Sequence, residues 1–293
     1  MAEHSRRFSY AMVGLIVVLV GALLFAGCTQ QPGGGGTPTP TVPPQKTTLK
    51  ITGSTTVLPI AQKAADVYMN DHASTDIQVT GGGSSVGVQA IGEGTADIGM
   101  SSRTLKSEEK TKYPNLQSTV IANDGIAIIV NKANTVNGLT LAQLRGIYNG
   151  TVTNWNAVGG PDQVIVVVGR DSASGTREFF WESVMKKENF TATQLEKNSN
   201  GAIKQTIVQT PGAIGYVGLG YVDAEVNAVP IMVNGTPVDA TVGTVISGKY
   251  PISRPLLMIT QGPPAGVAKS YIDFILSPAG QKIVTDEGFV PLA

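Results

Sequence analysis

The stretch from Arg170 to Arg177 carries the residues best suited to binding a small anion. Arg170 offers a forked set of charged donors that matches a tetrahedral oxyanion, and Ser174 and Thr176 add hydroxyl groups. Gly175 lets the backbone approach a ligand closely. The stretch follows a β-branched run and precedes a helical pattern, so it contains a helix N-terminus. The unpaired N–H groups of such a terminus favour an anion. An ordinary capped helix explains the same residues, and the stretch alone does not decide.

Two other loops share this composition, at residues 53–56 and 81–85. Each follows a predicted strand and precedes a predicted helix, and together they contribute Thr55, Thr56 and Ser84. Strands that alternate with helices predict an α/β fold, in which ligands bind at the carboxyl ends of the strands. If the three loops converge, neutral dipoles and one or two arginines surround a single anion.

Composition excludes several classes of function. The net charge is zero and only 14% of the 293 residues are charged, which argues against nucleic-acid binding. The single cysteine, Cys28, allows no intrachain disulfide, and His4 and His72 are the only histidines. Zinc sites of the Cys/His type and histidine-based triads are therefore excluded, and we expect neither a cofactor nor a metal.

The N-terminus has the pattern of a secretion signal. Arg6 and Arg7 precede an apolar run over 11–27, and Cys28 follows Ala-Gly. This cysteine resembles the lipidated residue of bacterial lipoproteins, although Phe25 departs from the usual aliphatic residue. An uncleaved membrane anchor is the alternative, since the run is near the lower length limit for a span. Residues 28–47 are rich in Gly, Thr and Pro and predict a tether.

Further along the chain, hydrophobic patterns predict more strands and helices. A capped helix is expected over 139–148, a mostly helical segment over 193–209, a strand over 229–233 and a turn at Asn234-Gly235. Long buried strands are expected over 125–130 and 255–259.

The motifs, in their order along the chain, resemble the extracytoplasmic phosphate-binding proteins of high-affinity phosphate ABC importers. They are Gly53-Ser54-Thr55-Thr56, Gly83-Ser84-Ser85, the segment from Asp97 to Arg103, Arg170 with Ser174-Gly175-Thr176, and the segment from Gly212 to Tyr216. The resemblance covers residues 48–293. It implies a type II periplasmic-binding-protein fold, with lobe 1 at 48–130 plus 256–293 and lobe 2 at 131–255. A ligand cleft would separate the lobes, and the two long strands would cross between them as a hinge.

The resemblance also implies the residues that contact phosphate. They are Thr55, Thr56, Ser84, Ser102, Arg170, Ser174, Gly175 and Thr176. Well-known members have an aspartate in place of Ser102, and it accepts the proton of hydrogen phosphate. Here Ser102 and Arg103 are expected to donate instead, and another carboxylate could supply the acceptor, since an unsatisfied buried donor is costly.

Asp124 and Asp171 are the candidates for this acceptor, but Asp171 also suits orienting Arg170, and Asp124 also suits a turn. Arg103 and Arg177 both suit ion pairs, and we expect Arg103 to be the one that contacts the ligand.

These observations predict a monomeric, tethered binding protein that delivers phosphate to an ABC permease. Three alternatives are a binder of sulfate, molybdate or tungstate, which the Ser102 departure favours, a secreted hydrolase, and an adhesion lipoprotein. A hydrolase is disfavoured because Gly-x-Ser-x-Gly and a suitable histidine are absent.

Overall fold

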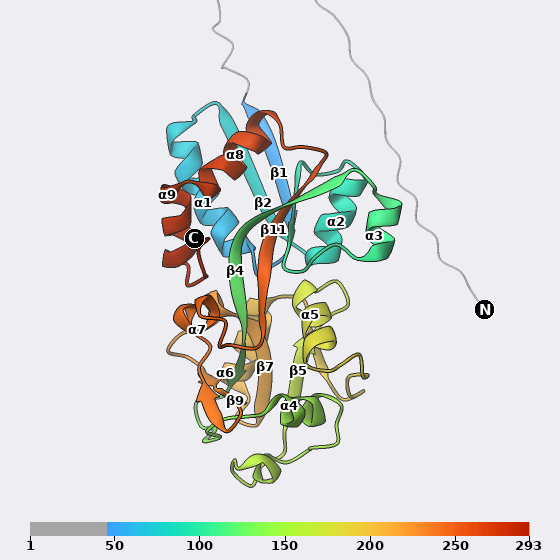
Figure 1. Cartoon of the computed structure of the whole chain (residues 1–293), viewed down its shortest axis with the longest axis vertical. Helices are drawn as coiled ribbons and strands as arrows, with labels where there is room; N and C mark the ends of the chain where they lie inside the picture. Colours follow the sequence, from blue (N-terminus) through green and yellow to red (C-terminus); the bar gives the residue numbers. More distant parts are fainter. Residues whose placement is uncertain (1–45, 293) are drawn as a thin grey trace, which may run out of the picture. The chain divides into compact units, whose positions relative to one another are not determined.

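The structure, a computed structural model, describes residues 46–292. The predicted signal or anchor at 1–27, Cys28 and most of the tether lie outside these residues. Within the described range, strands and helices alternate from β1 onward, as the sequence predicts for an α/β fold (Figure 1).

Nine strands of the described chain form one hydrogen-bonded series in the order β2-β1-β3-β11-β4-β7-β5-β6, with β8 paired to β4. In chain order they are β1 (Thr47–Gly53), β2 (Thr75–Gly81), β3 (Ile98–Ser101), β4 (Leu116–Val130), β5 (Val166–Arg170), β6 (Leu195–Lys197), β7 (Ala213–Gly218), β8 (Asn227–Val229) and β11 (Ser253–Gln261). The strands β1, β2 and β3 are parallel, as are β5, β6 and β7, whereas β4 and β11 run antiparallel to each other. Loops at the carboxyl ends of the parallel strands therefore gather at shared edges.

Helices follow most of these strands. They are α1 (Leu58–Asp71), α2 (Ser84–Gly92), α3 (Ser107–Lys112), α4 (Leu141–Tyr148), α5 (Gly175–Ser183), α6 (Asn200–Gln209), α7 (Val242–Ile246), α8 (Gly266–Leu276) and α9 (Pro278–Asp286). Thr140 caps α4 as expected, because its hydroxyl accepts a hydrogen bond from Gln143 N.

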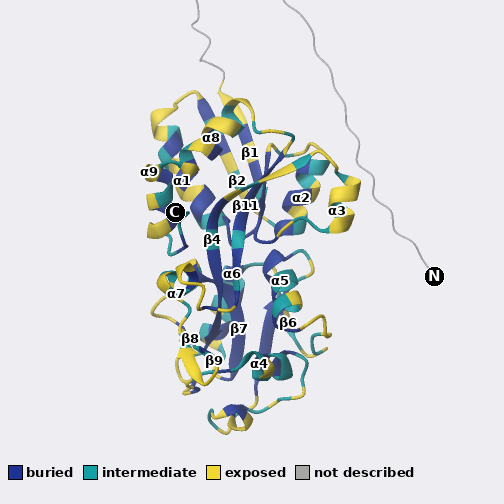
Figure 2. Ribbon diagram, in the orientation of Figure 1, coloured by how far each residue is buried: buried dark blue, intermediate teal, exposed yellow. Residues whose placement is uncertain are grey.

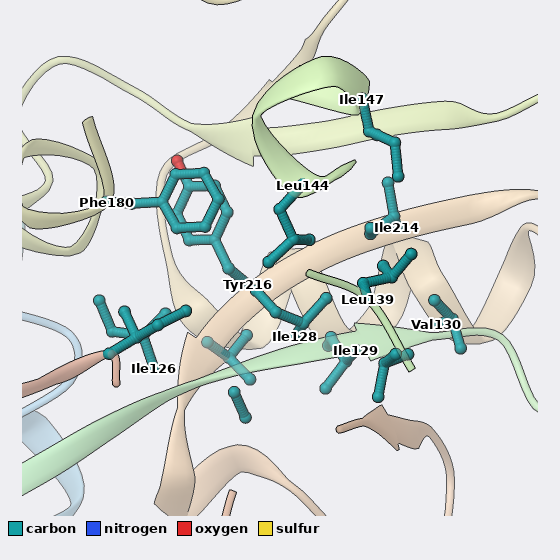
Figure 3. Close-up of a cluster of buried hydrophobic side chains, with 14 of the residues drawn as sticks. Ile126, Ile128, Ile129, Val130, Leu139, Leu144, Ile147, Phe180, Ile214 and Tyr216 are labelled. Carbon is teal, nitrogen blue, oxygen red and sulfur yellow. The ribbon is translucent and has the colours of Figure 1, made fainter. Parts of the chain in front are cut away.

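The two largest hydrophobic cores define two lobes. The core of lobe 1 joins strand residues such as Ile51 and Leu256 to Tyr271 of α8 and Val284 of α9. The core of lobe 2 is larger and contains Trp155, Phe180 and Tyr216. Figure 3 shows Phe180 and Tyr216 stacked beside the residues of β4, and their ring centroids lie 4.4 Å apart. The strands between the helices are the most buried part of both lobes (Figure 2).

Strands β4 and β11 cross from one lobe to the other (Figure 1). Ile121 and Ala122 of β4 belong to the core of lobe 1, whereas its residues 126–130 belong to the core of lobe 2. The lobe boundary that we expected after residue 130 therefore lies earlier, within β4. The first half of β4 lacked a sequence signal because Gln117, Ser118 and Thr119 interrupt the apolar pattern.

Two other predicted elements differ from the structure. The helix expected over 193–209 is instead the short strand β6 followed by α6, which begins after the cap residue Ser199. The strand expected over 229–233 is broken into β8 and β9 (Ile231–Val233), because Pro230 has no N–H to donate. The turn at Asn234-Gly235 is confirmed, since both residues have positive φ and connect β9 to β10 (Thr236–Val238).

Candidate functional site

The three predicted loops converge at the junction of the two lobes. Strands β1 and β2 pair in register at Gly53 and Gly81, and Gly83 N donates to Gly53 O, which joins the two loops of lobe 1. The loop after β5 reaches them from lobe 2, because Ser85 N donates to Ala173 O at 3.1 Å. The three loops therefore converge, which confirms the condition on which a single anion site depended.

Hydroxyl groups from both lobes meet at this junction. Thr56 Oγ1 lies 3.1 Å from Thr176 Oγ1, across the lobes. Ser102 N donates to Ser84 Oγ at 3.0 Å, so these two serines are adjacent. A Cβ atom placed on Gly175 would lie only 2.2 Å from Ser84 Oγ and 2.9 Å from Ser102 Oγ. The N-terminus of α5 therefore abuts the serines of lobe 1, and glycine is required for that approach.

Arg170 is buried at the same junction, with 1% of its surface exposed. Its Nε donates to Lys197 O and its Nη2 to Asn198 O, so two carbonyl groups orient the guanidinium. Within residues 46–292 it forms no ion pair and its Nη1 has no hydrogen-bond partner. Burial lowers the pKa of Arg170, and the nearby Tyr216 and Asp171 oppose that shift. A buried, oriented cation of this kind suits an anionic ligand.

Ser174 is the N-cap of α5, because its hydroxyl accepts a hydrogen bond from Arg177 N at 3.2 Å. The side chain thus has the role of an ordinary helix cap and is also buried beside Gly175 and Thr176. Its hydroxyl hydrogen remains free to donate to a ligand, since the cap uses only a lone pair.

Asn200 was not identified from the sequence, yet it contacts two of the predicted residues. Its Nδ2 donates to Thr55 Oγ1 and to Thr56 Oγ1, each at 3.1 Å, and its Oδ1 accepts a bond from Gly218 N. The two amide hydrogens occupy lone pairs of both hydroxyls, which leaves the hydroxyl hydrogens to donate elsewhere. Nothing in the sequence around Asn200 distinguishes it from a residue that begins a helix.

Tyr221 holds the same loop from lobe 2. Its hydroxyl donates to Thr55 O at 2.5 Å. Burial raises the pKa of Tyr221 to about 12, so it stays protonated and able to donate at neutral pH.

Asp124 is fully buried and pairs with Arg254, another residue that the sequence did not reveal. Asp124 Oδ2 accepts hydrogen bonds from Nε and Nη2 of Arg254, at 3.1 Å and 2.9 Å, and Oδ1 accepts one from Leu219 N. Burial raises the pKa of Asp124, whereas the charge of Arg254 opposes the shift. The carboxylate is therefore an ion-pair partner between the crossing strands, and the turn that we considered for it is wrong.

Arg103 is also engaged by a carboxylate. Its Nη1 and Nη2 donate to the two oxygens of Glu109, at 2.8 Å and 2.6 Å, and Nη2 donates to Ser85 Oγ. Arg103 therefore forms the ion pair that we considered as the alternative to a ligand contact, and the pair is buried. It leaves Arg103 with fewer free donors for a ligand than we expected. Arg177 lies 3.9 Å from Glu196 and over the ring of Phe190, outside the cluster of hydroxyls.

Asp171 differs from Asp124 in that its Oδ1 is buried and has no hydrogen-bond partner among residues 46–292. Its backbone N–H donates to Lys197 O, the same carbonyl that accepts a hydrogen bond from Arg170 Nε. Of the two candidate acceptors, Asp171 is the one with an oxygen that no donor occupies.

An ion pair bridges the lobes outside this cluster. Lys106 Nζ, at the start of α3, lies 3.0 Å from Glu178 Oε2 in α5. Both side chains are partly exposed, so the pair stabilises the approach of the lobes only modestly.

Residues 46–292 contain no group of three acidic, histidine or cysteine side chains arranged for a metal ion. In the same range no helix has the length and apolar character needed to span a membrane.

Comparisons with known proteins agree with this geometry. The family described as "PBP superfamily domain" matches residues 38–279. The phosphate-binding protein PstS of Bacillus subtilis is 34% identical over 246 residues, which covers 83% of this chain and 80% of that protein. A phosphate ABC transporter substrate-binding protein from Clostridium perfringens, solved with bound phosphate, is 39% identical with a TM-score of 0.79 and covers 84% of this chain and 100% of its own.

A phosphate transport receptor from Vibrio cholerae is 35% identical, with a TM-score of 0.69, over 84% of this chain and 100% of its own. The predicted two-lobed fold is therefore confirmed. On these similarities, the chain belongs to the PBP superfamily and, within it, to the family of the phosphate-binding proteins PstS.

Proposed function

We propose that this chain captures inorganic phosphate between its two lobes and delivers it to an ABC importer on the extracytoplasmic side of the membrane. The observation that carries the proposal is the meeting of the two lobes at the N-terminus of α5, where Gly175 abuts Ser84 and Ser102 and Thr176 contacts Thr56. The names of the relatives, which are phosphate-binding proteins, point to the same ligand.

The arrangement suits a tetrahedral oxyanion. The residues that we propose as ligand contacts are those expected from the sequence: Thr55, Thr56, Ser84, Ser102, Arg170, Ser174, Gly175 and Thr176. They offer hydroxyl and N–H donors, and Arg170 alone among them adds a full charge. Because the donors come from both lobes, an anion binds all of them only when the lobes are closed.

Asp171 is the proton acceptor in this proposal. Several hydroxyls have acceptor sites already occupied, since Asn200 donates to Thr55 and Thr56, and Ser102 N donates to Ser84. A hydrogen phosphate ion also carries an O–H that needs an acceptor, which fully ionised sulfate does not. The unoccupied Oδ1 of Asp171 is suited to that role, whereas donors already contact both oxygens of Asp124.

The chain needs no catalytic group for this function, and the relatives are named as binding proteins rather than enzymes. We further propose that Cys28 is lipidated and that residues 28–47 tether the folded part to the membrane. Mass spectrometry of the mature N-terminus tests the tether: an unmodified Cys28 or an intact residue 1 contradicts lipidation.

Calorimetric titration of the purified chain tests the main proposal. We expect tight binding of inorganic phosphate that excess sulfate does not displace. Tight binding of sulfate or molybdate without phosphate binding would assign the site to another oxyanion and overturn the proposal.

A further inference from the structure

We infer that Arg254, in the crossing strand β11, is a second guanidinium contact for the bound anion and acts together with Arg170. The inference rests on the proposed function, because it assumes that the anion lies where the two lobes meet. It adds a binding residue from the hinge itself, a region that the predicted contacts do not include.

The first observation is the hydrogen bonding of the Arg254 guanidinium. Only 3% of the residue's surface is exposed. Nε and Nη2 donate to Asp124 Oδ2, and Nη2 also approaches Thr56 Oγ1 at 3.3 Å. Nη1 is buried and has no partner among residues 46–292. Arginine carries five N–H donors, and a buried charged group with unused donors is unfavourable unless a ligand satisfies them.

The second observation is where this guanidinium lies. Its Nη2 contacts the Thr56 hydroxyl, and that hydroxyl is 3.1 Å from Thr176 Oγ1 of lobe 2. Arg254 thus contacts one of the two hydroxyls that meet across the lobes. None of the described side chains forms an ion pair with Arg170, whereas Arg254 has Asp124 as its partner.

The third observation is the proximity of the two buried cations. Arg254 lies close enough for its charge to contribute to lowering the pKa of Arg170. Two buried like charges repel each other, and an anion that both contact removes this repulsion. The carboxylate of Asp124 neutralises Arg254 only on one side of the guanidinium, that of Nε and Nη2.

The role of Asp124 follows from this geometry. It holds Arg254 by two donors and leaves the Nη1 edge free, which fixes the direction of that edge. Arg254 faces Asp124 in the pairing of β11 with β4, the strands that cross between the lobes. Asp124 therefore acts on the ligand through Arg254, as a positioning residue.

The test separates a ligand contact from a purely structural ion pair. Removing Arg254 alone leaves Asp124 buried without its ion-pair partner, so the informative comparison is Asp124→Asn against the double variant Asp124→Asn/Arg254→Gln. Both lack the carboxylate, and they differ only in the guanidinium. We expect the Asp124→Asn chain to bind inorganic phosphate at least tenfold more tightly than the double variant in calorimetric titrations. Equal affinities would overturn the inference.

Arg254→Lys provides a second measurement if either of those variants fails to fold. Lysine keeps a positive charge beside Asp124 but lacks the fork that supplies Nη1. We expect it to weaken phosphate binding at least tenfold, whereas an unchanged dissociation constant would contradict the inference. Arg145→Gln, a partly exposed arginine of α4, is the matched control and should leave the affinity unchanged.

Titration of the unaltered chain separates failure of the proposed function from failure of the role of Arg254. If it binds no phosphate, the proposed function fails. If it binds phosphate and the Arg254 variants bind equally well, only the role of Arg254 fails.

Discussion

Thr56 and Thr176 are 120 residues apart in the chain, yet their hydroxyl oxygens lie 3.1 Å from each other. Thr56 Oγ1 also receives N–H groups from Asn200 and Arg254, so its own hydrogen is left to donate. One hydroxyl thus connects lobe 1, lobe 2 and the hinge. Closure of the lobes and the direction of the donors are therefore parts of a single hydrogen-bonded arrangement.

Gly175→Ala should prevent closure without unfolding either lobe. The added methyl group would lie 2.2 Å from Ser84 Oγ, which can rotate away, but also 2.9 Å from Ser84 Cβ, which cannot, so the lobes must move apart to relieve the contact. We expect phosphate affinity to fall by at least about tenfold in calorimetry, with the melting temperature of the free protein nearly unchanged. Gly201→Ala is the control, because no atom lies within 4 Å of the added Cβ. Normal binding by the Gly175 variant would show that the lobes do not meet here.

Arg170→Lys should weaken phosphate binding strongly. Lysine cannot donate to the carbonyls of Lys197 and Asn198 and at the same time present a fork to the ligand. A hydrogen bond to a charged group contributes about 1.5–3 kcal/mol, so a loss of about 10- to 100-fold in affinity is expected. A melting curve checks that the variant folds. Unchanged affinity would mean that the site is misplaced.

Asn200→Ala should weaken binding by loosening the orientation of two hydroxyls. Without the amide, Thr55 Oγ1 loses the side-chain donor that orients it, and Thr56 Oγ1 keeps only the donor from Arg254. We expect about a tenfold loss of phosphate affinity, together with a small loss of stability. Ser199→Ala is a matched control, since it removes the cap of α6 and about 0.5–2 kcal/mol of stability but contacts neither hydroxyl. Equal affinities of the two variants would argue against this role.

Asp171→Asn should reduce the discrimination between phosphate and sulfate. The amide can donate where the carboxylate only accepted, so it no longer selects a ligand that carries a proton. In competition titrations we expect sulfate to displace phosphate from this variant but not from the unaltered chain. If sulfate remains excluded, the acceptor is another group.

The Arg103–Glu109 pair should make stability depend on pH in the acid range. Burial raises the pKa of Glu109, but hydrogen bonds from Arg103 and Lys106 N outweigh it, and the net pKa lies below its ordinary value. Glu109 therefore stabilises the fold above the pKa of the unfolded chain, near 4.3, and this contribution is lost as the pH falls through the lower folded value.

Glu109→Gln should accordingly lose less stability than the unaltered chain on acidification. Urea unfolding at a series of pH values from about 6 to 3 measures the difference between the two proteins. Parallel curves for both would show that another carboxylate dominates the acid range.

The sequence predicted the part of the site that depends on local pattern. Thr55, Ser84 and Thr176 follow strands and open helices, and parallel strands bring such loops to one edge of a sheet. Asp124, Arg254 and Asn200 have a different origin, because their partners are fixed by strand register and lobe contact. Asp124 and Arg254 are 130 residues apart, and no local signal indicates that they face each other.

The predicted secondary structure differs from the observed one where the strands are polar. The first half of β4 has exposed Gln117 and Ser118, and β6 is a short strand with exposed Leu195 and Glu196. Neither shows the apolar run or alternation by which a buried strand is identified. Both are specified by neighbouring strands, which a single pass along the chain does not reveal.

The sharing of β4 and β11 between the lobes also bears on the order in which the chain folds during synthesis. The core of lobe 1 contains Ile51 near its start and Tyr271 and Val284 near its end, so it closes only when the last helices have been made. Lobe 1 therefore cannot complete its core until nearly the whole chain has been made. For a protein with the export route that we propose, this delay keeps lobe 1 unfolded, and able to cross the membrane as an extended chain, until synthesis is nearly complete.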